Sequence, residues 1–189
     1  MTHTIIARPV AEPLTLAQVK VHLRLDGSPE DALLTSLIAA ARHYLEATTG
    51  LALITRTLRF YLDDWPADGV IQLAVAPLQT VESVTVYDAS GNPQAVSLAG
   101  HVLDAVSSPA RLFLAKQPPT ARPLNGIEID VAAGFGNTGA EVPDALTRAM
   151  LMHVALMYEL RGAVPAEMQP AAVPAGYDRL VSPYRAVRL

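Results

Sequence analysis

The stretch SPEDALLTSLIAAARHYLEATTG, residues 28–50, decides the fold class of the first part of the chain. Ser28 is placed to cap a helix, Pro29 suits its first turn, and the acids that follow complement the positive end of the helix dipole. Apolar residues then recur every three or four positions, the period of an amphipathic helix. Gly50 is placed to end it. We therefore predict a long helix that buries one face.

A shorter helix is predicted just before this one. Thr15 and Gln18 have the spacing of a capping box, and Leu14 and Val19 have the spacing of a hydrophobic staple. An Asp-Gly pair that ends at Gly27 predicts the end of the helix. The first fifty residues therefore read as helical.

From residue 55 the apolar period changes to two residues. Short, often β-branched stretches alternate with Pro, Gly, Asp and Asn, which predicts strands joined by turns. We expect these strands over residues 55–62, 70–75, 81–87, 101–104, 111–115 and 127–132. Because no helix lies between them, they predict an antiparallel sheet or a small sandwich.

Helical spacing returns after Pro143. A row of residues there advances by four and three, which predicts a seam that packs against a partner helix. The residues of this seam are Leu146, Met150, His153, Met157 and Leu160. An Ala/Pro-rich stretch, residues 163–174, reads as a linker, and a short helix over residues 175–181 follows it.

These elements predict an α+β fold. A small α-helical bundle comes from both chain ends, residues 1–53 and 134–182, and an antiparallel β domain, residues 54–133, is inserted between them. Residues 183–189 form a C-terminal tail. The simplest packing places helices from the two ends in one bundle.

Composition narrows the classes of function. Hydrophobic residues make up 51% of the chain and charged residues 17%, with a mean hydropathy of +0.27, and we interpret the apolar surplus as surface buried against other chains. The formal net charge is −4 and the body of the chain has no basic patch, which argues against tight DNA binding. The chain has no cysteine and no apolar run long enough for a membrane helix. We expect a protein made in a cytoplasm, with no membrane partner.

Three glycines, Gly134, Gly136 and Gly139, match the G-x-G-x-x-G pattern of dinucleotide sites. One alternative reading is therefore a small nucleotide-binding enzyme built around residues 134–139. However, the following helix begins only near Pro143, and no parallel strand follows it. We favour a glycine-rich turn between a strand and a helix, and we expect no cofactor.

No catalytic residue or metal-binding set is predicted. The histidines lack the spacing of metal ligands, and His153, on an apolar helix face, is interpreted as a packed residue. Asp63, Asp64 and Asp68 lack the spacing of a calcium loop, so we interpret them as a solvated turn. No serine lies in a nucleophile elbow.

The C-terminal tail is the candidate binding segment. It combines aromatic, basic and apolar residues, types that are enriched at binding hot spots. A frayed terminus is the other reading, and the residues alone do not decide between the two. The candidates are Pro183, Tyr184, Arg185, Arg188 and Leu189.

Several short sequences stand in a specific order along nearly the whole chain. They occupy residues 14–26 (LTLAQVKVHLRLD), 31–34, 40–50 (AARHYLEATTG), 64–66 (DWP), 77–84 (PLQTVESV) with Tyr87, 133–136 (AGFG), 142–143, 158–162 (YELRG) and 180–185 (LVSPYR). In this order they resemble the head–tail connector (adaptor) family of tailed phages, prophages and gene-transfer agents.

The resemblance implies a structural role and not an enzyme. It implies a ring of about a dozen copies beneath the portal protein, which extends the DNA channel, lets DNA pass without specific binding, and contacts the next neck or tail-completion protein. It also implies that the C-terminal tail docks onto the portal, and that the protein resides in the neck of a virion or phage-like particle assembled in the bacterial cytoplasm. A neck or tail-completion protein one level lower and a monomeric interaction module remain as alternatives.

Overall fold

The computed structural model describes residues 2–160 and 173–185. Helices and antiparallel sheets occur together in these residues, so the protein has an α+β fold. The chain divides into two compact units. Among the described residues, one unit, which we call the β unit, contains residues 2–9 and Thr55–Gly134. The other, the helical unit, contains Val10–Ile54, residues 135–160 and residues 173–185.

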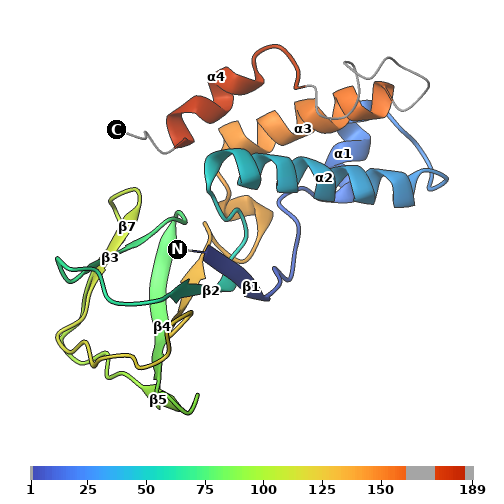
Figure 1. Ribbon diagram of the computed structural model, residues 1–189. Helices are drawn as coiled ribbons and strands as arrows, with labels where there is room; N and C mark the ends of the chain where they lie inside the picture. Colours follow the sequence, from blue (N-terminus) through green and yellow to red (C-terminus); the bar gives the residue numbers. More distant parts are fainter. Residues whose placement is uncertain (1, 161–172, 186–189) are drawn as a thin grey trace. The chain divides into compact units, whose positions relative to one another are not determined.

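In the helical unit α3 packs against each of the other helices (Figure 1). The helices are α1 (Leu16–Leu23), α2 (Asp31–Thr49), α3 (Asp144–Glu159) and α4 (Tyr177–Val181), with short 3-10 helices η1 (Gly139–Glu141) and η3 (Ser182–Tyr184). The apolar stripe of α2, including Leu34, Ile38 and Leu45, is buried as the helical period predicts.

The start of α1 confirms the predicted capping box. The Thr15 hydroxyl accepts the Gln18 N–H at 3.2 Å, and the Gln18 side chain accepts the Thr15 N–H at 2.8 Å. The helix ends before the predicted Gly27, because Arg24 adopts a left-handed conformation with φ 56°. The next N–H, that of Leu25, donates to the carbonyl of Lys20, which is the Schellman arrangement.

The ends of α2 agree with the sequence at one terminus and differ at the other. Gly50 ends the helix with φ 76°, as predicted. Ser28 is not the N-cap, because the helix starts three residues later and Glu30 occupies the capping position. The carbonyl of Ser28 instead accepts the N–H of Asp31 at 3.2 Å, so residues 28–31 form a turn ahead of the helix.

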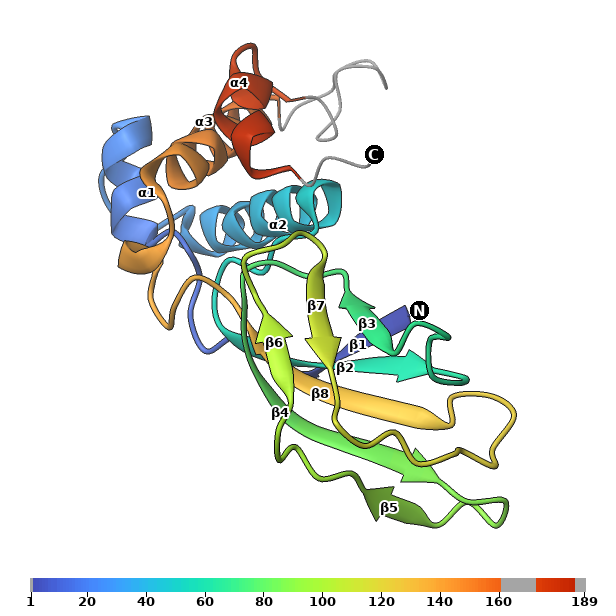
Figure 2. The same ribbon diagram turned by 90° about the vertical axis from the view of Figure 1, so that its left-hand side faces the viewer.

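The β unit contains two antiparallel sheets, and the smaller one lies beside β4 (Figure 2). The order of the first is β1 (Thr2–Ala7), β2 (Arg56–Leu62), β8 (Ile127–Ala133), β4 (Leu78–Tyr87) and β5 (Pro93–Ala95). The order of the second is β3 (Val70–Leu73), β7 (Ala110–Phe113) and β6 (Val102–Asp104). Each of the six predicted strands is present with ends shifted by a few residues, and β1 and β5 are additional.

Strand β8 has the burial that its alternating apolar and charged residues predict. It lies between β2 and β4, and Ile127, Ile129 and Val131 on one face are fully buried. The intervening Glu128 and Asp130 lie on the opposite face, as the strict alternation predicts.

Strand β1 differs from the prediction that the whole chain up to residue 53 belongs to the helical bundle. It pairs with β2 at the edge of the larger sheet, with Thr2 opposite Tyr61. All six of its residues are exposed. Because β1 buries neither face, its apolar and polar residues do not alternate, and the alternation that predicts a strand is absent.

Candidate assembly surfaces

The structure describes the predicted docking tail only as far as Arg185. Pro183 and Arg185 are exposed and Tyr184 is half-buried. The guanidinium group of Arg185 donates to Asp178 in α4 at 2.7 Å, so this arginine folds back on its own segment. The other two candidates, Arg188 and Leu189, lie outside the described residues.

An aromatic cluster joins α4 to the rest of the helical unit. The ring of Tyr177 lies 5.6 Å from that of His153 and 6.0 Å from that of Tyr44, and the last two lie 5.0 Å apart. All three contacts are edge-on, a favourable geometry for aromatic rings. The Tyr177 hydroxyl is buried and has no hydrogen-bond partner in the part of the chain that the structure describes. This burial raises the pKa of Tyr177 to about 12.

The residues of the predicted helix seam lie on the inner side of α3. Four of them are buried and one, Leu160, is half-buried. His153 is only 1% exposed and lies within the aromatic cluster, in agreement with its interpretation as a packed residue. The buried members are Leu146, Met150, His153 and Met157.

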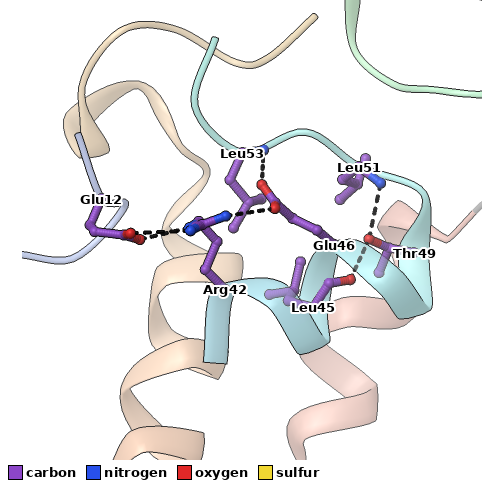
Figure 3. A network of polar contacts seen from close by, with 7 residues as sticks. All are labelled: Glu12, Arg42, Leu45, Glu46, Thr49, Leu51 and Leu53. Carbon is purple, nitrogen blue, oxygen red and sulfur yellow. Dashed lines mark hydrogen bonds and ion pairs between the residues drawn. The ribbon is translucent and has the colours of Figure 1, made fainter. Parts of the chain in front are cut away.

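A buried ion-pair network joins α2 to the chain segments that precede and follow it (Figure 3). Arg42 donates to the two carboxylate oxygens of Glu12 at 2.7 and 3.2 Å and to Glu46 at 3.1 Å. Glu46 also accepts the N–H of Leu53 at 2.9 Å. Burial has the largest effect on the pKa of Arg42 and lowers it, but the two carboxylates together raise this pKa above its ordinary value.

Only part of this network has a signal in the sequence. The spacing of Arg42 and Glu46, four residues apart on one helix, is a signal for an ion pair. Glu12 lies 30 residues before Arg42 and carries no such signal. The network holds α2 to the segment before it, through Glu12, and to the segment after it, through Leu53, and this role is structural.

The glycine-rich turn has a packing reason for each of its glycines. Gly134 has φ 146°, a conformation that other residues rarely adopt. A Cβ at Gly136 would collide with the Glu141 carboxylate, which caps η1, and a Cβ at Gly139 would collide with the backbone carbonyl of Pro13. The turn thus needs its glycines for close packing of the chain on itself, as the turn interpretation predicts.

The outer face of the larger sheet carries a polar network. Arg59 binds Asp130 at 2.7 and 2.8 Å and Glu128 at 2.8 Å, and the Tyr87 hydroxyl donates to Glu128 at 3.0 Å. The guanidinium group of Arg122 lies over the Tyr87 ring at 5.3 Å. The hydrogen bonds to Asp130 are the main reason that the pKa of Arg59 is raised. Two arginines and two carboxylates gather here, so the formal charges of this network balance and it is not a basic, DNA-binding surface.

Asp104 organises the connection between β6 and β7. Its carboxylate accepts the N–H groups of Val106 and Ser107, the Ser107 hydroxyl at 2.7 Å, and Arg111 at 2.6 Å. These donors, the Ser107 hydroxyl first and Arg111 next, lower the pKa of Asp104 well below its usual range. Val106, at this turn, is 97% exposed.

The aspartates around Trp65 cap turns, in agreement with the sequence interpretation. Each accepts a backbone N–H: Asp63 that of Asn125, Asp64 that of Trp65, and Asp68 that of Val70. Within residues 2–160 and 173–185 no group of three or more His, Cys, Asp or Glu side chains could hold a metal ion. In the same residues no helix has the length and apolar character needed to cross a bilayer.

A shallow apolar groove lies between α1 and α3. Val21, which is 80% exposed, lines it. The other lining residues are Ala17, Gln18, His22 and Leu151. No sequence pattern described above predicts this groove.

Comparison with known proteins gives the class of the chain. Residues 13–95 match the family described as "Phage gp6-like head-tail connector protein". A search of curated proteins finds no match. Among solved structures, a chain of "Neck of empty GTA particle computed with C6 symmetry" is 31% identical, with a TM-score of 0.83, and a chain of "Virion of native gene transfer agent (GTA) particle" is 31% identical, with a TM-score of 0.84. A chain of "Neck of native GTA particle computed with C12 symmetry" is 30% identical, with a TM-score of 0.80.

Each of these three alignments covers 100% of this chain and 97% of the other. The class that the matches define is that of structural connector proteins of virus-like particles. The chain belongs to the phage gp6-like head–tail connector family. This confirms the family that the sequence resemblance indicated, and the protein is a structural connector.

Proposed function

We propose that this chain is a ring-forming subunit in the neck of a phage or gene-transfer-agent particle. The ring lies beneath the portal, extends the DNA channel and contacts the next neck or tail-completion protein. The observation that carries this proposal is the full-length likeness, at 30–31% identity, to chains from gene-transfer-agent particles, two of them from necks computed with C6 and C12 symmetry. Heterologous contacts repeated around a symmetry axis close into a ring.

The architecture proposed for each subunit is a helical bundle from both chain ends with an inserted antiparallel β domain. Two features support it. The helical unit contains residues from both sides of the chain's middle, and the β unit contains Thr55–Gly134. In addition, α3 packs against α1 and α2, which lie on the other side of residues 55–134 in the sequence.

The charges suit a channel through which DNA slides. The net charge of −4 repels the phosphate backbone, and the Arg59 guanidinium is engaged by Asp130 and Glu128 instead of being free for phosphates. A lumen that held DNA through many phosphate contacts would oppose its passage. We therefore propose that DNA passes without specific binding.

The C-terminal tail is the proposed contact to the portal. The Arg185–Asp178 pair is solvent-exposed, because the two side chains are 39% and 66% accessible. Exposed pairs contribute only about 0–1 kcal/mol, so exchanging Asp178 for an acidic group of the portal costs little. The residues proposed for docking are Pro183, Tyr184, Arg185, Arg188 and Leu189.

The test is a deletion of residues 182–189, examined with portal protein from the same genome. We expect negative-stain images of the deleted protein to show rings, and pull-down with the portal to fail. The matched control replaces two exposed positive residues elsewhere, Arg8→Ala and Lys116→Ala, and should keep both properties. Unchanged portal binding by the deletion variant would refute docking through the tail. If the intact protein forms no annular assembly with or without portal, the ring proposal is wrong.

A further inference from the structure

Two buried side chains hold α4 on the helical unit. Tyr177 is 1% exposed and Val181 is fully buried, whereas Asp178 and Arg179 between them are exposed. Tyr177 enters the aromatic cluster beside Tyr44 of α2 and His153 of α3, and α4 packs on α3. Within the described residues, α4 is therefore held on α3 mainly through the burial of these two side chains.

The polar contacts of this segment stay local. The Tyr177 N–H donates to the carbonyl of Pro174, the Arg185 N–H to that of Ser182, and the Arg185 side chain to Asp178. Among the described residues, no hydrogen bond or ion pair links residues 173–185 to α1, α2 or α3. Apolar contacts are non-directional. The segment can therefore leave without breaking a hydrogen bond or ion pair to the described residues of α1, α2 or α3.

One of the two anchors carries a penalty in the docked state. The Tyr177 hydroxyl is buried without a hydrogen-bond partner in the described residues. A hydroxyl taken out of water without a partner destabilises the state that buries it. A phenylalanine would make the same ring contacts with Tyr44 and His153 and would not have this penalty. The hydroxyl therefore weakens the docked state selectively, because it regains water or a new acceptor when α4 leaves.

We propose that α4 is a releasable anchor: it covers the Tyr44–His153 surface in the isolated subunit and leaves that surface when the C-terminal tail binds its neighbour in the neck. This inference rests on the proposed docking of the tail to the portal. Release frees Tyr177 and Val181 to bury in the partner and gives the Tyr177 hydroxyl access to an acceptor there. A partner that binds only the released form has an apparent affinity in proportion to the fraction of released molecules. The more tightly α4 packs on its own subunit, the more weakly the tail binds the partner.

The first arm of the test measures release without any partner. Hydrogen exchange of the amides in residues 177–185 is followed by mass spectrometry in the full-length protein and in Tyr177→Phe. Removing the buried hydroxyl should slow exchange by about tenfold, since that penalty is lost. Tyr177→Ala, which removes the ring, should speed exchange by about tenfold or more. Tyr44→Phe is the matched control: it changes a half-buried tyrosine of the same cluster and should leave exchange within about twofold.

The second arm measures binding to portal protein by the same variants. Because the open form is rarer in Tyr177→Phe, its portal affinity should fall by about tenfold. If α4 instead bound the portal in its docked position, Tyr177→Phe would bind as well as the unchanged protein.

The outcomes separate this inference from the proposed function. Slower exchange together with weaker portal binding in Tyr177→Phe supports it. Slower exchange with unchanged binding overturns the coupling between release and docking, and unchanged exchange overturns the releasable anchor itself. If the unchanged protein does not bind portal at all, the proposed docking is wrong and the coupling fails with it, while the exchange arm still decides whether α4 is released.

Discussion

Replacing Arg42 with methionine should destabilise the helical unit by about 3 kcal/mol. The side chains of Arg42 and Glu46 are only 8% and 11% exposed, and removing one partner of a buried ion pair costs about 3–5 kcal/mol. Glu12 is 33% exposed, so loss of its contact adds at most about 1 kcal/mol. Methionine fills much of the volume of the arginine stem, which keeps the estimate at the lower end of this range.

Urea unfolding with two probes measures this effect. Far-ultraviolet circular dichroism follows the helices, and the fluorescence of Trp65, the single tryptophan, follows the β unit. The indole N–H donates to the carbonyl of Pro118 at 2.6 Å in that unit, so its signal reports local order there. The midpoint from circular dichroism should fall more than the midpoint from fluorescence.

A second substitution tests the cause. In Arg42→Met/Glu46→Gln the carboxylate charge is gone, while the amide oxygen still accepts the N–H of Leu53. The double variant should recover about 2 kcal/mol of the loss, because the buried charge was its main source. A single variant that costs less than about 1 kcal/mol, or a double variant no more stable than the single one, would refute the reasoning.

Three further predictions concern the turns. Gly139→Ala should lower the free energy of unfolding by about 3 kcal/mol, because its Cβ meets the fixed carbonyl of Pro13. Gly136→Ala should lower it by only about 1 kcal/mol, because the Glu141 side chain can turn away. Thermal unfolding that gives the reverse order contradicts this reasoning. The pKa of Asp104 is lower in the folded protein, so its contribution to stability is complete above the ordinary carboxyl pKa and is lost as pH falls through the folded value; a carboxyl signal that titrates by NMR at the usual pH would show otherwise. NAD or ATP should move the melting temperature by less than about 1 °C, and a clear rise would revive the nucleotide-site alternative.

The helices were predictable where local chemistry decides them. Thr15 and Gln18 form their capping box within one turn, and Gly50 ends α2 in the left-handed conformation that glycine favours. Ser28 shows the limit of such signals, since a good capping residue that the chain uses in a preceding turn looks the same in sequence. The alternation in β8 was readable because one of its faces is fully buried.

The contacts that join distant parts of the chain were not predictable. Glu12 reaches Arg42 from a segment with no secondary structure, and no periodic pattern records that distance. Strand β1 is exposed along its length, so its sequence lacks the alternating apolar pattern of a half-buried strand. The surface under α4 depends on Tyr177 meeting His153, which only the packing of the two helices brings together. For the candidate tail, the residue types could be read from the sequence, whereas the bond from Arg185 back to Asp178 of α4 could not.

The place of β1 in the larger sheet also has a consequence for synthesis on the ribosome. Its partner β2 is paired on the other side with β8, which ends at Ala133, and α1 and α2 pack against α3, which begins only at Asp144. The nascent chain therefore completes neither unit until most of its length has emerged, and the two units mature almost together instead of one after the other. A subunit whose synthesis stops before Ala133 would lack both a finished sheet and a finished bundle, so such a copy has no intact half with which to enter a particle.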